Sequence, residues 1–132
     1  MWIFFNDAYL SIVTDKADPN NYMVRARFVK DIERVFPDAI VTETLSRDYR
    51  FRASIPIDTV TKAIANRVAN INYNNFKDST TTNLRHDIYL EVWAILERWQ
   101  EKLLPAKQKA KQNKRFLDAW QHYLDARYGP AE

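Results

Sequence analysis

A single glycine, Gly129, occurs in this chain of 132 residues. Phosphate-cradling loops, dinucleotide-binding turns and nucleophile elbows all need glycine where the backbone approaches a ligand or adopts a positive φ. The sequence therefore builds none of these motifs. Tight turns must rely on asparagine and aspartate, which occur at positions 6–7, 20–21 and 72–75.

Aromatic residues make up much of the apolar part of the chain, with four tryptophans, seven tyrosines and seven phenylalanines. This composition predicts a folded domain with a substantial core. The absence of cysteine excludes disulfides, thiolate zinc sites, iron–sulfur ligation and cysteine nucleophiles. The apolar start at residues 1–5 is too short for a signal peptide or a membrane span, so we expect a cytoplasmic protein without a membrane partner.

Four arginines lie in two segments in which polar and apolar residues alternate. Residues two apart on a strand share a side, so Arg25 and Arg27 are expected on one face of the sheet. Arg50 and Arg52 follow the same rule in the second segment, with Tyr49 expected on the apolar side. If the two strands are neighbours, four guanidinium groups crowd one face. Such a face needs acidic partners from the fold or an anion from outside.

The hydrophobic pattern predicts an α+β fold, in which a small antiparallel sheet has helices packed on one face and is followed by a long C-terminal helical hairpin. Asp58 is the expected N-cap of the second helix. We predict a core domain over residues 1–104 and a basic C-terminal helix over 105–132. The expected strands are residues 2–5, 9–14, 22–27, 39–44 and 49–57, and the expected helices are residues 28–36, 58–71, 83–104 and a last segment that ends near residue 128.

The positive charge is concentrated at the C-terminal end. Residues 1–101 hold 13 Lys and Arg against 14 Asp and Glu, whereas residues 102–132 hold 7 against 3. Such a run attracts phosphate backbones, and it also occurs as a solvated helix face that keeps a protein soluble. Besides Lys102, the cationic residues of this run are Lys107, Lys109, Lys111, Lys114 and Arg115.

The helix expected over residues 83–104 carries an unusually wide apolar arc. Such an arc needs two neighbours: one is expected to be the sheet, and the other the last helix or a second copy of the chain in a homodimer. The first stripe of the arc is Leu84, Ile88, Val92, Ile95 and Trp99, and the second is Tyr89, Trp93, Leu96 and Leu103.

A polar loop at residues 72–82 lies between two strong helices. One interpretation is that Tyr73 and Phe76 attach this loop to the core. The other is that Lys77 and Arg85 join the four sheet arginines in an anion-binding cleft. The two histidines, His86 and His122, have no second histidine at metal-ligand spacing, and we expect no metal and no cofactor.

The sheet arginines also allow two interpretations. They can pair with nearby acids, for which Glu43, Asp48, Asp31 and Glu33 are the candidates. Alternatively they bind phosphate, which the arginine fork matches in a bidentate way, with Tyr9 and Tyr22 as nearby aromatics for base stacking. The sequence contains no known nucleic-acid-binding motif.

Several motifs together resemble a family of short, uncharacterised bacterial proteins. The resemblance covers roughly residues 1–100, leaves out the lysine-rich helix, and implies no activity. The motifs are Met1-Trp2-Ile3-Phe4, Val24-Arg25-Ala26-Arg27, Asp48-Tyr49-Arg50-Phe51-Arg52, Ile71-Asn72-Tyr73-Asn74-Asn75-Phe76-Lys77 and Tyr89-Leu90-Glu91-Val92-Trp93.

These observations favour a non-enzymatic binding protein that engages nucleic acid or another polyanion, such as a protein–nucleic acid complex. The arginine face and the basic helix would provide the binding surface. The alternative is a protein–protein inhibitor or adaptor of phage or mobile-element origin, resembling an anti-CRISPR, that acts on a nucleoprotein complex. An enzyme for a phosphorylated substrate is a third hypothesis, but no base or nucleophile accompanies the arginines.

Overall fold

The computed structural model describes residues 1–103 and 106–128, with the side chains of 106–113 and 128 left out of the description. The chain divides into two compact units, Met1–Asp87 and Ile88–Glu132. This division falls after Asp87, whereas the sequence prediction placed a boundary after residue 104. The predicted α+β class is confirmed, because an antiparallel sheet with helices precedes a helical C-terminal region.

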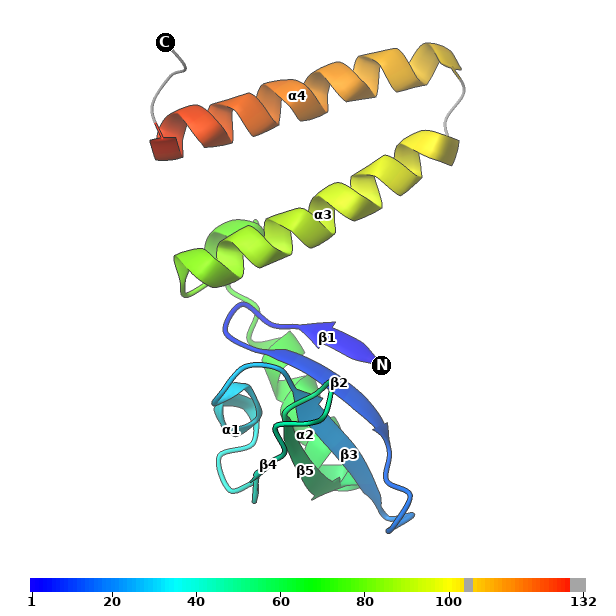
Figure 1. Ribbon diagram of the computed structural model, residues 1–132, viewed down its shortest axis with the longest axis vertical. Coiled ribbons are helices and arrows are strands. Elements are labelled where there is room, and N and C mark those ends of the chain that lie inside the picture. The colour runs from blue at the N-terminus through cyan, green and yellow to red at the C-terminus, as the bar shows by residue number, and fades with distance from the viewer. Residues whose placement is uncertain (104–105, 129–132) are drawn as a thin grey trace. The chain divides into compact units, whose positions relative to one another are not determined.

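The first unit is built on an open sheet with the strand order β1-β2-β3-β5-β4, in which every neighbouring pair is antiparallel. A turn at Asn6 and Asp7 joins the first two strands, as their polar side chains predict. The strands, shown in Figure 1, are β1 (Trp2–Phe4), β2 (Tyr9–Thr14), β3 (Asn21–Ala26), β4 (Thr42–Glu43) and β5 (Phe51–Pro56).

One face of this sheet is apolar and carries the core. Helices α1 (Asp31–Val35) and α2 (Ile57–Ala69) pack against the sheet, and Figure 1 shows α2 behind the strands. The alternation of side chains along each strand explains why the core side chains come from every second residue. The largest apolar side chains that are fully buried are Leu10, Val24, Ile32 and Val60.

The segment expected as a strand at residues 39–44 pairs with the sheet only at Thr42 and Glu43. The start of α2 also differs from the prediction, because its N-cap is Pro56 and Asp58 lies within the first turn without capping the helix. The fixed φ of proline suits a helix start, so the chain turns into the helix without a side-chain cap. Val68 lies near the C-terminal end of α2 and is 60% exposed.

Helix α1 begins in a strained conformation. Its N-cap, Lys30, has φ 69° and ψ −1°, in the left-handed region that costs a residue with a Cβ roughly 1–2 kcal/mol. We expect Lys30→Gly to raise the free energy of unfolding, because glycine adopts a positive φ without strain. The gain should be about 1 kcal/mol or less, since the greater entropy of glycine in the unfolded chain opposes it. Urea titration measures this change.

Lys30→Ala is the matched control for this prediction. Both substitutions remove the exposed ion pair of 3.2 Å between Lys30 and Glu33, but alanine keeps the Cβ and therefore the strain. Equal stability of the two variants would contradict the assignment of strain to this position.

The second unit contains two long helices. Most of α3 (Asn83–Leu103) lies in this unit, followed by α4 (Ala106–Tyr128). The Trp93 ring stacks on Phe116 with 5.6 Å between centroids, and Phe116 stacks in turn on Trp120 at 6.3 Å. These contacts join α3 to α4, as the predicted hairpin requires. In the part of the chain that the structure describes, no helix is both long and apolar enough to cross a membrane.

Candidate anion-binding site

The two arginine strands are direct neighbours. Arg25 of β3 lies opposite Arg52 of β5 in the antiparallel register, and Ser11 of β2 lies opposite Arg25 on its other side. Residues that face one another across a ladder share a face of the sheet. The structure therefore confirms that the arginine strands pair, and it places Arg25 and Arg52 on the face opposite the core. Arg27 and Arg50 lie just outside β3 and β5. Arg50 pairs with Glu43 and lies over the ring of Phe51, which packs against the core, so it does not join the other three. We call Arg25, Arg27 and Arg52 the arginine face.

A buried tyrosine lies against two of these arginines. Tyr49 is 4% exposed, and the guanidinium carbons of Arg25 and Arg27 lie 4.6 Å and 4.4 Å from the centroid of its ring. The prediction that Tyr49 lies on the apolar side is wrong. Strand β5 begins only at Phe51, so strand alternation does not govern Tyr49, and the bend before the strand turns its ring onto the arginine face. Stacking on an aromatic face partly offsets the repulsion between two guanidinium groups.

The phenol of Tyr49 is held in a polar environment. Burial alone would raise its pKa, but hydrogen bonds with Tyr9 and Ser11 and the positive charge of Arg27 outweigh burial and lower the pKa below 10.0. The Tyr49 and Tyr9 hydroxyl oxygens are 3.4 Å apart. The ring is therefore held by the two guanidinium groups and at its hydroxyl tip, which makes it a rigid support for the arginines.

Two of the four arginines have acidic partners. Arg50 Nε donates to Glu43 Oε1 at 2.6 Å, and Arg52 donates to the Asp48 carboxylate at 3.2 Å. Both pairs are partly or largely exposed, so they are worth little in water. The other two candidate acids, Asp31 and Glu33, pair with residues outside the arginine face.

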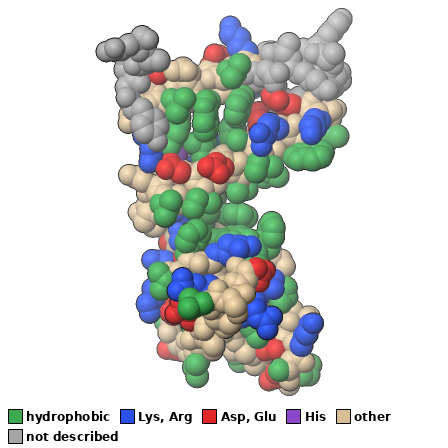
Figure 2. All heavy atoms as spheres, viewed as in Figure 1, with side chains coloured by type: hydrophobic (Ala, Val, Ile, Leu, Met, Phe, Trp, Pro, Cys, Tyr) green, Lys and Arg blue, Asp and Glu red, His purple; other side chains and the backbone are tan. Residues whose placement is uncertain are grey.

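Arg25 and Arg27 have only neutral partners among the described side chains. Arg25 donates to the Ser11 hydroxyl at 2.7 Å, and Arg27 donates to the Asp48 backbone carbonyl at 2.7 Å. The Arg25 Nε is buried and has no hydrogen-bond partner within the described chain. A guanidinium carries five donors, so the exposed Arg27 keeps most of its own for a ligand. Figure 2 shows basic side chains over the sheet with a few acidic ones among them.

An exposed aromatic side chain lies at the edge of the same face. Trp2 of β1 is opposite Ser11, which is itself opposite Arg25, and its side chain is 67% exposed. Its ring makes an edge contact with Tyr9 at 6.3 Å. Tyr22, expected as an exposed aromatic, instead packs against the core on the opposite face, and Tyr9 is buried.

A carboxylate occupies the far end of β2. The hydrogen bond from the Ser54 hydroxyl, followed by one from the Ala17 backbone N–H, lowers the pKa of Asp15 below 3.8. Asn21 donates to the same Ser54 hydroxyl at 3.0 Å. Asp15 is thus held charged by neutral donors rather than by the arginines.

We expect Ser54→Ala to raise the pKa of Asp15 towards 3.8, because it removes the largest cause of the lowering. A lowered carboxyl pKa stabilises the fold above the unfolded value, and this stabilisation is lost as the pH falls through the folded value. The variant should therefore be less stable at neutral pH and depend less on pH below about 4. Carbon-detected NMR titration of the Asp15 carboxyl checks the shift, with the exposed Ser46→Ala as control. An unchanged pKa in Ser54→Ala would contradict this account.

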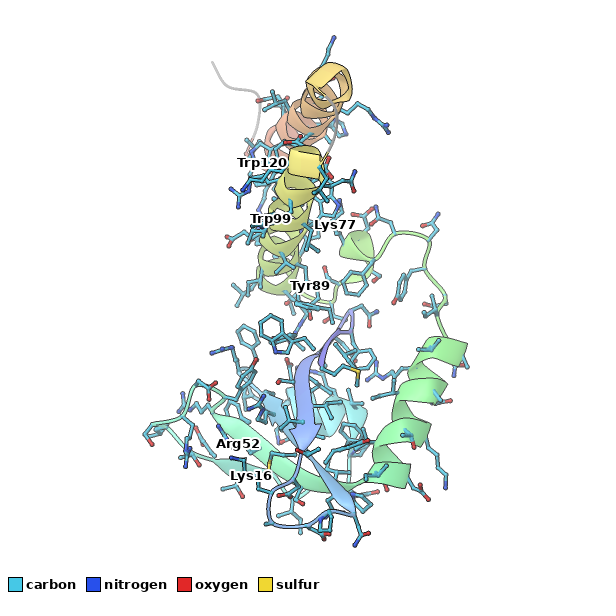
Figure 3. All side chains as sticks on the ribbon, turned by 90° about the vertical axis from the view of Figure 1, so that its right-hand side faces the viewer. Lys16, Arg52, Lys77, Tyr89, Trp99 and Trp120 are labelled. Carbon is cyan, nitrogen blue, oxygen red and sulfur yellow. The ribbon has the colours of Figure 1, made fainter. Side chains whose placement is uncertain are left out.

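The two cationic residues expected to complete the cleft lie elsewhere. Arg85 forms an ion pair of 2.7 Å with the fully buried Asp31, and its guanidinium also lies over the Phe28 ring. Lys77 is in the short 3-10 helix η1 (Lys77–Ser79), and Figure 3 shows it well apart from Arg52. The structure thus brings Arg25, Arg27 and Arg52 together around Tyr49, whereas Arg50 pairs with Glu43 and Arg85 with Asp31.

Only part of the lysine-rich run can be placed. Lys114 and Arg115 are exposed on α4. The side chains of Lys107, Lys109 and Lys111 lie outside the described residues. These five residues belong to the second compact unit, whereas the arginine face belongs to the first.

Two features of the site were missed by sequence reasoning. Trp2 was counted only as part of an apolar start, although alternation from Phe4 back to Trp2 was a usable signal. Tyr49 had no such signal, because its orientation follows from the bend before β5 rather than from a repeating pattern.

The described side chains include no group of three or more His, Asp or Glu residues that could hold a metal ion. Together, the fold and the site define an α+β domain with a cationic sheet face. Comparison of the chain with models of protein families, with curated proteins and with solved structures found no match.

Proposed function

We propose that this protein is a non-enzymatic binding protein whose arginine face engages a phosphate-bearing polyanion, with single-stranded nucleic acid as the ligand. The observation that carries the proposal is the pair Arg25 and Arg27, stacked on Tyr49 without an acidic partner among the described residues. Three arginines and one carboxylate, that of Asp48, leave this surface with an excess of positive charge. Phosphate would supply the missing acceptors.

Trp2 favours a single strand over a duplex. An exposed aromatic ring beside a cationic groove is the combination that proteins use to stack unpaired bases while the backbone is neutralised. Bases of a duplex are already stacked and would leave Trp2 without a partner. Lys114 and Arg115 on α4 would add non-specific attraction, without being part of the same site.

The test is fluorescence anisotropy of labelled single- and double-stranded DNA and RNA over a range of salt concentrations. Arg27→Ala should weaken single-strand binding and reduce the slope of log affinity against log salt by about 1, because one phosphate contact is lost. Lys62→Ala, which removes one exposed charge from α2, is the matched control and should leave the slope unchanged.

Trp2→Ala separates stacking from charge. This variant should lose about 1–3 kcal/mol of single-strand affinity at every salt concentration, with an unchanged salt slope. Lys114→Ala/Arg115→Ala reports the share of α4. Wild-type protein that binds no nucleic acid at physiological salt would overturn the proposal and favour the alternative of a protein partner.

A further inference from the structure

Helix α3 exposes large apolar side chains over its second half. Ile95 is 45% exposed, Leu96 64% and Trp99 59%, and Leu103 at the helix end is 84% exposed. Isolated exposed apolar residues are ordinary, but a continuous stripe on one helix marks an interaction surface. We therefore expect another helix or protein to cover this stripe.

The stripe does not face α4. Trp93 marks the side of α3 that packs on α4, through its stacking on Phe116. At 100° per residue, the centre of the line through Ile88, Val92, Ile95 and Trp99 lies about 130° around the axis from Trp93. The helical hairpin thus uses one side of α3 and leaves Ile95 and Trp99, on another side, exposed.

The same line has the spacing of a coiled-coil seam. Ile88, Val92, Ile95 and Trp99 are separated by four, three and four residues, which are the steps between d and a positions of a heptad. Ile88 and Val92 are half-buried, whereas the other two are exposed. A seam of this kind is completed by a second helix with the same spacing.

Charges beside the seam point to that second helix. Glu91 and Arg98 both occupy g positions and are exposed, and neither forms an ion pair with another described side chain. We propose that the seam binds a second copy of this chain in an antiparallel homodimer. Ile88 then lies opposite the partner's Trp99, and Val92 opposite the partner's Ile95. In this register Glu91 meets the partner's Arg98, and two-fold symmetry makes the pair twice.

Other arrangements of two copies are less favourable. An antiparallel shift by one heptad places Arg98 against the partner's Arg98 and brings Lys102 into the seam. A parallel pair places Trp99 against the partner's Trp99 and leaves Glu91 and Arg98 beside leucines. Because g positions set the orientation of helix pairs, the charges select the antiparallel register.

The test is a charge swap on the full chain, followed by sedimentation equilibrium. Glu91→Arg and Arg98→Glu each turn two attractive pairs into two repulsive ones, so each variant should have a dimer dissociation constant roughly tenfold higher than wild type. In an equimolar mixture, the heterodimer of the two variants contains only opposite-charge pairs. The mixture should therefore form this heterodimer with wild-type affinity. The double variant Glu91→Arg/Arg98→Glu should recover it as well.

Two results would overturn the proposal. The first is a wild-type chain that stays monomeric at about 100 µM, well above the micromolar constants of ordinary dimers. The second is a mixture that associates no better than the separate variants, which would exclude this register. Circular dichroism confirms that each variant is folded. Since the chain has no cysteine, Val92→Cys mixed with Ile95→Cys gives a second readout, and the mixture should form more disulfide-linked dimer than either variant alone.

Discussion

Replacing Asp31 by alanine is expected to lower the free energy of unfolding of the first unit by about 3–5 kcal/mol. The Asp31 carboxylate is fully buried and accepts hydrogen bonds from Arg34, from Arg85 and from the Tyr9 backbone N–H at 2.9 Å. Its removal takes away the buried carboxylate with which Arg85, whose side chain is only 11% exposed, forms an ion pair. A buried charge that has lost its partner is among the most destabilising defects a fold can carry.

Urea unfolding followed by the backbone amide NMR signals of β2 and β3 measures this loss within the first unit. Glu33→Gln is the matched control on the same helix. Glu33 pairs with a largely exposed lysine at 3.2 Å, so this variant should lose less than about 1 kcal/mol. If the two variants were equally stable, Asp31 would not be the electrostatic centre of the fold.

Replacing Tyr49 by alanine is expected to cost about 3–5 kcal/mol of stability, the usual range for deleting a large buried aromatic ring. The ring is 4% exposed, and its loss opens a cavity beneath Arg25 and Arg27. The two guanidinium groups would then lack the aromatic ring on which both are stacked. At temperatures where the variant is folded, its affinity for single-stranded nucleic acid should also fall, because the arginines are no longer held in place.

Tyr49→Phe keeps the ring and removes only the hydroxyl. That hydroxyl lies 3.4 Å from the Tyr9 hydroxyl, a long contact, so the loss should be near 1 kcal/mol and binding should be retained. Urea titration and anisotropy on the same samples provide both readouts. Weak binding by Tyr49→Phe would show that the hydroxyl contributes more than the ring.

The proposed binding and the proposed dimer rest on different residues and can fail separately. Arg27 and Trp2 lie in the first unit, whereas Glu91 and Arg98 lie in the second. A variant that loses dimerisation but keeps its binding at a single site would therefore test only the proposed dimer. If both proposals hold, the dimer presents two arginine faces, and two linked sites bind a long polyanion more tightly than one.

The sequence by itself determined the fold class and the side of the sheet on which the arginines within strands lie. Strand alternation has a period of two, so Arg25 and Arg52 lie opposite the apolar side chains of their own strands wherever those strands pair. Arg50 precedes β5 and was not fixed in this way. Helical spacing in the same way gives the positions of the apolar residues of α3, of which Trp93 contacts α4 while Ile95 and Trp99 are exposed. Local periodicity carries this information because it depends only on backbone geometry.

The tertiary structure alone decided which charges stay uncompensated. Asp31 was a candidate partner for the sheet arginines, yet it is buried against Arg34 and Arg85, and Arg85 was expected in the cleft. Tyr49 likewise lies against Arg25 and Arg27 and not on the apolar side, where it was expected. Ion pairs and ring stacking join residues that are far apart in the chain. Burial and geometry in the folded chain decide which of the possible partners pair. A pattern within a short segment does not show which charges will pair. The lack of an acidic partner for Arg25 and Arg27 among the described residues is therefore seen only in the folded chain.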